Sequence, residues 1–200
     1  MNALYQRDLH FQLSHPLFAG IDEAGRGPLA GPVVIAAVVL DYSKPLEGLN
    51  DSKKLSPKKR EILYEQIVAS ALDYSIVELD AEYIDEHNIL QATLTGFAMA
   101  FSKLVTTPPF CLIDGKDTPK SMKPFAQAVV KGDSLQACIA AASVLAKVHR
   151  DRLMTYYDSI YPEYGFAQHK GYGTALHCRN IRTYGLSPIH RKSFHVPEGW

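Results

Sequence analysis

Short apolar runs recur along the chain and predict its strands. Near the start, an apolar stretch that ends at Ile21 and the run Val33 to Leu40 enclose a turn-forming segment rich in glycine and proline. Three further runs follow at Tyr74 to Leu79, at Phe110 to Ile113 and at Ala128 to Val130. We therefore expect a sheet that begins early and gains strands along most of the chain.

The segments between these runs carry apolar residues every three to four positions, which is the spacing of helices. Ser56 suits the N-cap of the first helix and Pro57 its first helical position, and the pattern continues to about Ala71. A second helix includes Leu90 to Leu104 and ends before a pair of prolines. A third helix, rich in alanine, is predicted from Leu135 to about Tyr157.

The alternation of strands and helices predicts an α/β fold with a mixed central sheet flanked by helices. The last forty residues or so are rich in Gly, Pro, Tyr and His, which favours a short C-terminal region of loops with one short helix. We interpret this region as a binding surface. Because no repeat, low-complexity tract or long linker interrupts the pattern, residues 1–200 are expected to form a single domain.

The composition fits one globular domain. With 200 residues, of which 46% are hydrophobic and 21% charged, the chain can bury a sizeable core. Its longest apolar run is far shorter than the roughly 20 residues of a membrane helix, and Met1 to Leu17 carries charged side chains. We expect no signal peptide and no membrane span. Three cysteines without the close pairs of a zinc or redox motif favour the reducing cytoplasm.

The charges balance, with 21 basic and 21 acidic residues, so bulk attraction to nucleic acid is not indicated. Their distribution is more informative. Basic residues gather between Lys53 and Arg60 and again between Arg179 and Lys192. Either group could contact phosphates or form an ordinary solvated face, and the charges alone leave both interpretations open.

Acidic residues stand at the ends of three predicted strands. Asp22 and Glu23 follow the first strand and lead into the turn from Ala24 to Pro28. Asp114 ends another strand, and Asp133 lies just beyond a third. Each alone could merely cap a turn or a helix. Side by side, these carboxylates would raise one another's pKa values unless a cation lay between them, and all-oxygen ligands suit Mg²⁺ or Mn²⁺.

The segment Gly20 to Pro28, GIDEAGRGP, resembles the signature of ribonuclease HII, the bacterial type 2 ribonuclease H. Six further segments resemble blocks of that family and occur in the family's order. They are NDSKKL at 50–55, LIDG at 112–115, VKGDS at 130–134, AASVLAKV at 141–148 followed by Arg150-Asp151, HKGY at 169–172 and HRKSF at 190–194. The resemblance extends over about residues 18–194, which is too far to be a chance match.

The resemblance implies a ribonuclease H-like fold and a metal-dependent endonuclease. Such an enzyme hydrolyses the RNA strand of RNA–DNA hybrids and cuts on the 5′ side of ribonucleotides embedded in duplex DNA, leaving 3′-hydroxyl and 5′-phosphate ends. Water would be the attacking group, with two Mn²⁺ or Mg²⁺ ions at the site. The implied catalytic and metal-binding residues are Asp22, Glu23, Asp114 and Asp133.

The resemblance also implies how a ribonucleotide would be recognised. The turn Gly25, Arg26, Gly27 would contact the 2′-hydroxyl and the adjoining phosphates, and Tyr172 would support the same nucleotide. Asp151 is left outside the metal set, because it could pair with a neighbouring arginine or cap local structure. Further contacts with the hybrid are expected from polar-loop residues, although such residues are often merely solvated. They are Ser52, Lys53, Lys54, His169, Lys170 and Arg191.

Two other functions fit part of the pattern. The related type 3 ribonuclease H shares the implied fold, but the turn from Gly25 to Gly27 favours type 2. A silent hybrid-binding module would lack at least one of the four carboxylates, and all four are present. The expected partners are RNA–DNA hybrid and ribonucleotide-containing duplex DNA, with no membrane, no obligate protein partner and a monomeric state. A chain that ends at Trp200 would leave little room for a partner-recruiting tail.

Overall fold

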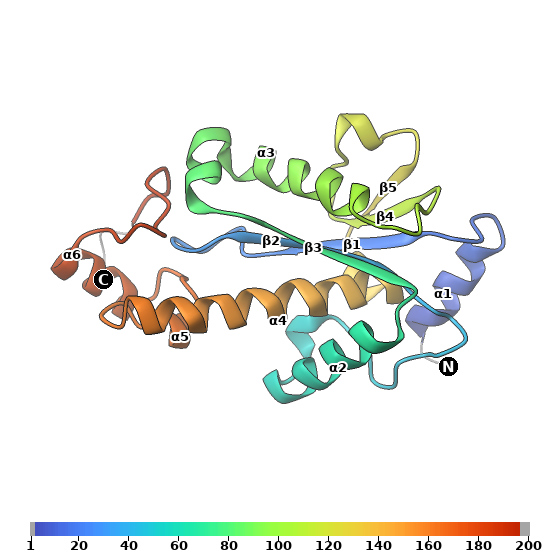
Figure 1. The fold of residues 1–200 in the computed structure, drawn as a ribbon, viewed down its shortest axis with the longest axis horizontal. Helices are drawn as coiled ribbons and strands as arrows, with labels where there is room; N and C mark the ends of the chain where they lie inside the picture. The colour runs from blue at the N-terminus through green and yellow to red at the C-terminus, as the bar shows by residue number, and fades with distance from the viewer. Residues whose placement is uncertain (1–2, 197–200) are drawn as a thin grey trace.

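Five strands form one mixed sheet at the centre of the molecule. They are β1 (Ala19–Ala24), β2 (Val33–Val39), β3 (Asp73–Leu79), β4 (Cys111–Asp114) and β5 (Ala126–Val129). In the order β3-β2-β1-β4-β5, the first three strands pair antiparallel and the last three pair parallel. The computed structural model, which describes residues 3–196, confirms the mixed central sheet expected from the sequence (Figure 1).

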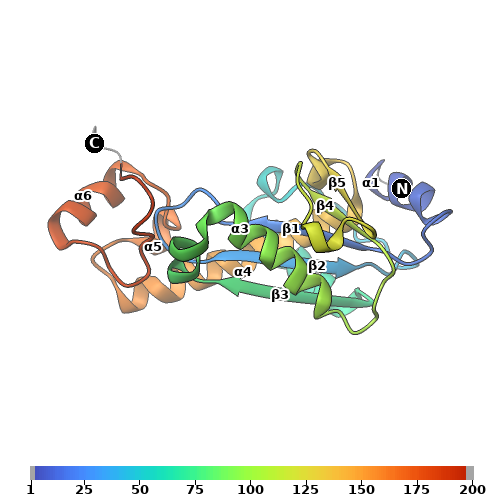
Figure 2. The same ribbon diagram turned by 90° about the horizontal axis from the view of Figure 1, so that it is seen from above.

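Two long helices cover the two faces of this sheet, α4 (Ala137–Ile160) on one side and α3 (Ala81–Ser102) on the other (Figures 1 and 2). The even-numbered residues of β2 from 34 to 38 pack into the core beside α4, and its odd-numbered residues from 33 to 39 pack into the core beside α3. Because both faces are covered, the sequence of β2 is a continuous apolar run rather than an alternating one.

Helix α4 approaches β1 most closely at Gly20. A Cβ atom on this residue would lie 2.2 Å from the carbonyl carbon of Cys138 and 2.4 Å from the nitrogen of Ile139. Only glycine allows this approach. Asp22 follows two residues later on the same face of the strand, so the close packing also sets how Asp22 lies beside α4.

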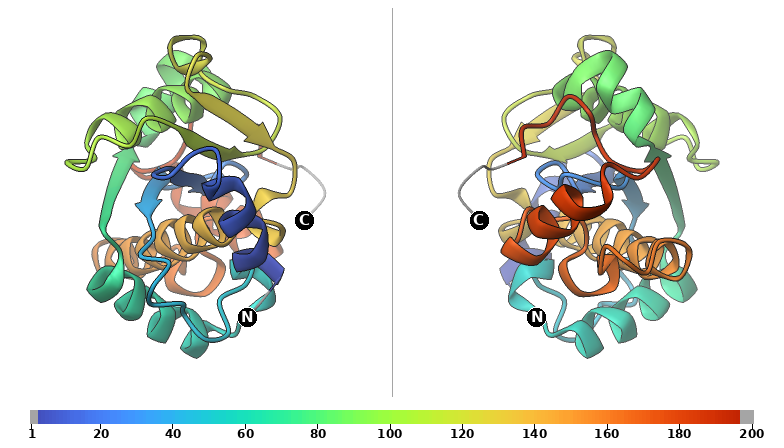
Figure 3. Two further views of the ribbon diagram at one scale, coloured as in Figure 1. Left: turned by 90° about the vertical axis from the view of Figure 1, so that its right-hand side faces the viewer. Right: turned by 90° about the vertical axis from the view of Figure 1, so that its left-hand side faces the viewer.

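Two further helices pack against α4. Helix α2 (Pro57–Ser70) begins as predicted, with the Ser56 hydroxyl accepting a hydrogen bond from the Lys59 amide at 3.3 Å and Pro57 in the first turn. Helix α1 (Ala3–Gln12) was not predicted from the apolar pattern. It lies at the N-terminal end of α4, where Asp8 bonds the amides of Ala137 and Cys138, and the left view of Figure 3 shows it in front of the sheet.

Helix starts differ from the sequence prediction in two places. Helix α3 begins at Ala81 and is kinked at Asn88, whose φ is 62° and whose side-chain oxygen accepts bonds from the amides of Leu90 and Gln91. The apolar spacing that predicted this helix, from Leu90 to Leu104, therefore covered only the segment of α3 after the kink. Helix α4 begins at Ala137 rather than at Leu135, because a short 3₁₀ helix, η3 (Gly132–Ser134), precedes it.

The C-terminal region contains two helices rather than the single short helix expected. They are α5 (Phe166–His169) and α6 (Ala175–Tyr184), with the turn that carries Tyr172 between them (Figure 3). Residues 1–2 and 197–200 lie outside the described residues. The second range includes Trp200, on which the expectation about a partner-recruiting tail depended. Of the helices in residues 3–196, none combines the length and the apolar character needed to cross a bilayer.

Candidate metal centre and nucleic-acid interface

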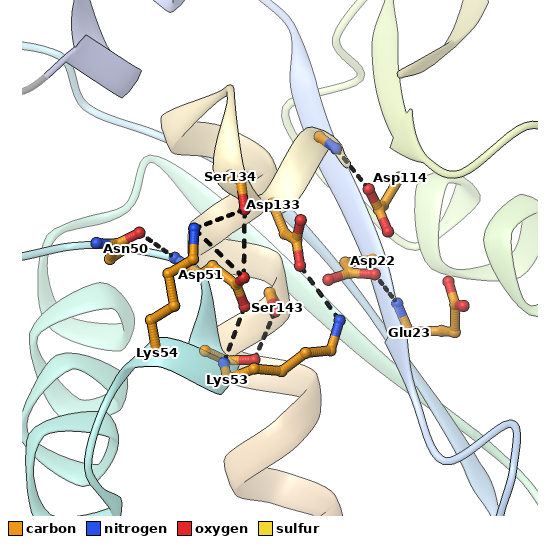
Figure 4. A network of polar contacts seen from close by, with 12 residues as sticks. Asp22, Glu23, Asn50, Asp51, Lys53, Lys54, Asp114, Asp133, Ser134 and Ser143 are labelled. Carbon is orange, nitrogen blue, oxygen red and sulfur yellow. Dashed lines mark hydrogen bonds and ion pairs between the residues drawn. The ribbon is translucent and has the colours of Figure 1, made fainter. Parts of the chain in front are cut away.

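Three of the predicted carboxylates meet at one end of the sheet. Strands β1 and β4 run parallel with Ile21 opposite Ile113, so the next residues, Asp22 and Asp114, emerge side by side. Asp133 reaches the same place from η3, just after β5. One side-chain oxygen from each of these three residues lies within 4.8 Å of the others. Figure 4 shows the three side chains gathered at this end of the sheet. Parallel pairing of neighbouring strands thus brings together residues that are far apart in sequence.

The Asp114 carboxylate is held from one side by the turn that carries Asp133. The amide of Gly132 donates a hydrogen bond to Oδ1 of Asp114 at 2.6 Å. A Cβ atom on Gly132 would lie 2.5 Å from the terminal methyl of Ile139, so a larger residue here would require that side chain to move. The backbone of this turn therefore fixes the orientation of the Asp114 carboxylate.

The electrostatics of the three-carboxylate cluster call for a cation. Burial raises the pKa of Asp22 well above its ordinary range, and the nearby charges of Glu23 and Asp114 raise it further. Burial also raises the pKa of Asp114, with Asp133 adding to the effect. A divalent cation would relieve this repulsion, and a site made of carboxylate oxygens fits Mg²⁺ or Mn²⁺ in ligand chemistry.

Glu23 lies beside this cluster but outside the group of three whose oxygens meet. As the residue after Asp22 in β1, it points to the other face of the strand. Burial raises its pKa, the Arg26 charge opposes that shift, and Asp114 supports it. Its Oε1 lies 3.5 Å from Nη1 of Arg26. Glu23 therefore connects the cluster to the turn that follows β1.

A short 3₁₀ helix, η1 (Ser52–Lys54), borders the cluster on the side of α4. The Lys53 ammonium lies 3.3 Å from Oδ2 of Asp133, and the Ser52 hydroxyl lies 2.7 Å from that of Ser143 in α4 (Figure 4). Ser143 also hydrogen-bonds Asp22. The structure thus places both Ser52 and Lys53 at the site, as expected. It adds Ser143, which the sequence gave no separate reason to select within an alanine-rich helix.

Next to the carboxylates, a pocket of about 230 Å³ gathers most of the expected recognition residues. Its lining includes Glu23, the glycine-rich turn Gly25, Arg26, Gly27, and the side chains of Lys53, Lys147 and Tyr172. A Cβ atom on Gly27 would meet the Tyr172 ring at 3.8 Å, so the ring lies against the turn. Gly25 has φ +100°, and a Cβ there would collide with Arg150. Gly25 is buried against Arg150, whereas Arg26 and Gly27 are exposed, so a ligand can approach the backbone of this turn closely at Gly27.

Arg191 is not on the surface of this pocket. Its side chain is buried, and its guanidinium donates hydrogen bonds to carbonyl groups of the recognition turn, which are those of Gly25, Arg26, Pro28 and Gly31. Arg150, also buried, donates to the carbonyls of Ala30, Pro32 and Lys170. The expected contact between Arg191 and a substrate is therefore wrong, because all of the Arg191 donors bond backbone carbonyls. The two arginines therefore hold the backbone of the recognition turn from its buried side.

His169 and Lys170 also differ from expectation. His169 is buried, with Nε2 2.8 Å from the Tyr164 carbonyl and Nδ1 accepting a bond from the Gly171 amide at 3.2 Å. The Lys170 ammonium donates to the Thr155 hydroxyl at 2.8 Å on α4. Asp151 lies outside the carboxylate cluster and pairs with Lys147 at 2.7 Å rather than with an arginine.

Comparisons with known proteins agree on one family. The family model for ribonuclease HII matches residues 19–196. A ribonuclease HII from Marinomonas sp. is 54% identical over 178 residues, which is 89% of each chain. The solved ribonuclease H2 of Pyrococcus horikoshii superposes with a TM-score of 0.77 and 30% identity, covering 90% of this chain and 94% of its own. Ribonuclease HII of Archaeoglobus fulgidus, solved in a complex with PCNA, superposes with a TM-score of 0.75 and 25% identity, covering 91% and 96%.

Proposed function

The chain belongs to the ribonuclease HII family, and from this premise we propose that it also cuts duplex DNA on the 5′ side of an embedded ribonucleotide. Membership makes the protein a metal-dependent nuclease with ribonuclease H activity on RNA–DNA hybrids. The proposal adds the embedded ribonucleotide as a substrate, the position of the cut and the residues that carry out the reaction.

The meeting of Asp22, Asp114 and Asp133 is the observation that carries the proposed chemistry. These three residues, with Glu23 beside them, would hold divalent cations of the Mg²⁺ or Mn²⁺ type. Two bound cations would supply the Lewis acidity for attack by water on the scissile phosphate and for departure of the 3′ oxygen. The chain itself orients two of the carboxylates, through the Gly132 amide on Asp114 and the Ser143 hydroxyl on Asp22, and both contacts oppose the rise in pKa that burial causes.

Recognition of the ribonucleotide is proposed to take place in the adjoining pocket. Backbone groups of Gly25 and Gly27 would contact the 2′-hydroxyl, Arg26 and Lys53 would contact phosphates, and the Tyr172 ring would support the sugar. A site built to bond a hydroxyl can reject the analogue that lacks it by roughly 10⁴- to 10⁵-fold. The pocket is suited to this role because the two buried arginines already fix its turn before a ligand binds.

The same domain is proposed to act as a monomer over residues 1–200, without an obligate protein partner. The PCNA complex describes the Archaeoglobus fulgidus protein. Light scattering after gel filtration tests the proposal for this chain, and a mass near 22.2 kDa supports it. A mass of twice that value at micromolar concentration would overturn the monomeric state.

The activity proposal is tested with three labelled duplexes of one sequence. One is all DNA, one contains a single ribonucleotide, and one is an RNA–DNA hybrid. With Mg²⁺ or Mn²⁺, we expect a single cut on the 5′ side of the ribonucleotide, cleavage of the hybrid and no cleavage of DNA. Chelation of the metal should stop both reactions. Cleavage of the hybrid with no cut at the single ribonucleotide would overturn the embedded-ribonucleotide proposal, and would favour a type 3 preference for longer tracts.

A further inference from the structure

Three histidines lie buried behind the Tyr172 turn, and the proposed chemistry uses none of them directly. The exposed fractions of His169, His177 and His190 are 8%, 0% and 1%. The rings of His169 and His177 stack with centroids 4.3 Å apart, and His190 follows at 5.1 Å from His177. All three come from the C-terminal region that the sequence marked as a binding surface. Buried polar rings need hydrogen-bond partners, so their contacts are informative.

The contacts of His177 and His190 fix where their protons lie. Nδ1 of His177 is 3.0 Å from the Tyr172 carbonyl, which can only accept, so this nitrogen carries the proton. Its Nε2 is then an acceptor, and the proton of the bond at 3.0 Å belongs to Nε2 of His190. That leaves Nδ1 of His190 as an acceptor. The Ser187 amide, which can only donate, lies 2.8 Å from it.

The bonds at the two ends, to the Tyr172 carbonyl and from the Ser187 amide, therefore require the same tautomers of His177 and His190. Starting from a carbonyl at one end or from an amide at the other gives the same tautomers, with both rings neutral. The bonds run in one direction from Ser187 through His190 and His177 to the Tyr172 carbonyl, and we call this series the histidine relay. Burial lowers the pKa of both histidines to about 4, so the relay stays neutral at ordinary pH.

His169 holds the residue before Tyr172 in the same manner. Its Nδ1 accepts from the Gly171 amide at 3.2 Å, and its Nε2 donates to the Tyr164 carbonyl at 2.8 Å. The Gly171 carbonyl accepts in turn from the Leu29 amide at 2.8 Å. This last bond ties the Tyr172 turn to the recognition turn. Both sides of the pocket are thus anchored to one buried polar network.

The turn needs such anchoring because its backbone is unusual. Lys170 and Gly171 both have positive φ, at 53° and 83°, and this backbone conformation is strained for a non-glycine residue such as Lys170. Tyr172 is 46% exposed, and its hydroxyl forms no hydrogen bond within residues 3–196. The position of the ring therefore depends on the backbone that carries it.

We propose that the histidine relay is a positioning device for the proposed recognition step, in which His177 and His190 hold the Tyr172 backbone so that its ring meets the sugar of the ribonucleotide. This inference depends on the recognition role proposed for Tyr172. His177 and His190 are positioning residues and touch no substrate. Misplacement of a recognition group by about 1 Å can lower the rate about 100-fold, so a buried relay of this kind affects turnover.

A double-mutant cycle tests the relay in the full chain on the duplex with one ribonucleotide. His177→Ala removes the donor to the Tyr172 carbonyl and should lower kcat/KM about 10- to 100-fold. His177→Asn keeps a donor near the position of Nδ1 and should recover much of the loss. In a Tyr172→Ala background, His177→Ala should cause little further loss, because the residue that it positions is already gone. Leu63→Ala, at a buried core position of α2, controls for lost stability and should not show this coupling.

The outcomes separate the two proposals. Normal kcat/KM in Tyr172→Ala overturns the role of Tyr172 and the relay with it. If Tyr172→Ala lowers kcat/KM but His177→Ala does not, the relay alone is overturned. The same holds if both substitutions lower kcat/KM and their effects are fully additive in the double mutant. If His177→Ala does not fold, nitrogen-15 NMR of the wild-type histidine rings decides. Protonated Nδ1 on His177 and protonated Nε2 on His190 support the relay, and any other pair of tautomers overturns it, whether or not the protein cuts the substrate.

Discussion

The Lys53 ammonium lies 3.3 Å from Oδ2 of Asp133, so a lysine from η1 reaches into the carboxylate cluster. The lysine side chain is 78% exposed whereas that of Asp133 is 6% exposed. Burial alone would lower the pKa of Lys53, but the charges of Asp133 and Asp22 raise it above its ordinary value. The ammonium thus offsets part of the negative charge that a divalent cation would otherwise neutralise.

This arrangement predicts that Lys53 opposes metal binding while it favours substrate binding. In Lys53→Met the carboxylates lose a positive neighbour, and Mn²⁺ should bind about two- to fivefold more tightly after allowance for solvent screening. The KM for a hybrid should rise, because a phosphate contact is lost. Calorimetric titration with Mn²⁺ and steady-state kinetics measure the two effects.

Lys54→Met is the matched control for this test. The Lys54 ammonium contacts Ser134 and lies 3.9 Å from Asp51, away from the three-carboxylate cluster. We expect its Mn²⁺ affinity to stay close to that of the wild type. Weaker Mn²⁺ binding in Lys53→Met, or equal changes in both variants, would show that Lys53 does not compete with the cation.

Asp114→Asn should abolish turnover and leave substrate binding almost unchanged. The amide keeps the shape of the side chain and an oxygen for the Gly132 amide, but it removes a charge from the proposed metal site. We expect kcat to fall on the order of 10³-fold or more, corresponding to about 4 kcal/mol, with the dissociation constant of the duplex changed by less than about threefold. Single-turnover kinetics and fluorescence anisotropy separate the two quantities. Asp117→Asn, in the exposed loop after β4, is the control, and near-normal cleavage by Asp114→Asn would rule out the assigned role.

The carboxylate cluster could be predicted because the apolar runs of the sequence mark where its strands end. Asp22 and Asp114 each come at the end of an apolar run, and parallel neighbours place such ends together. Helix α1 was missed for the opposite reason. Its inner face includes a fully buried aspartate, Asp8, and a pattern that assigns charged residues to the surface does not detect such a helix.

The roles of the basic residues were harder to predict, because a charged side chain can face a ligand or the backbone. Arg191 belongs to a basic group that suggested phosphate contact, yet its donors all meet carbonyls of the recognition turn. His169 likewise lies in a family block, yet its ring faces inward and bonds the Tyr164 carbonyl. Spacing along the chain gives the position of such residues but not which atoms they contact. That depends on tertiary structure formed by distant segments.

Arg191→Lys should destabilise the protein although it preserves the charge. The guanidinium makes five hydrogen bonds to four buried or partly buried carbonyls, and an ammonium has three donors and no planar fork. With at least one carbonyl left unpaired, we expect the free energy of unfolding to fall by about 2 to 4 kcal/mol. The KM for the single-ribonucleotide duplex should rise as the recognition turn loosens. Urea denaturation and kinetics report the two effects, with exposed Arg179→Lys as the control, and unchanged stability would contradict the anchoring role.

Asp8 predicts a pH dependence of stability. Its buried carboxylate accepts hydrogen bonds from the amides of Ala137 at 3.1 Å and Cys138 at 2.8 Å, and so caps α4 from a distant helix. Burial raises its pKa from 3.8 to about 6, and the bond from Tyr42 only partly opposes this shift. The folded protein therefore holds the proton more tightly than the unfolded chain does. Between pH 4 and pH 6 the contribution of Asp8 to the free energy of unfolding should fall as pH rises, by at most about 3 kcal/mol.

Asp8→Asn isolates this contribution, because asparagine has the same shape and does not titrate. Urea denaturation at several pH values gives the difference in unfolding free energy between wild type and variant, from which the other titrating groups cancel. We expect the wild type to have its largest advantage near pH 4 and to lose much of it by pH 7. Asp41→Asn provides the control, because bonds from Ser43 and Lys44 lower the pKa of Asp41 to about 2, below this pH window. A difference between wild type and Asp8→Asn that stays constant from pH 4 to pH 7 would show that Asp8 does not carry the shifted pKa.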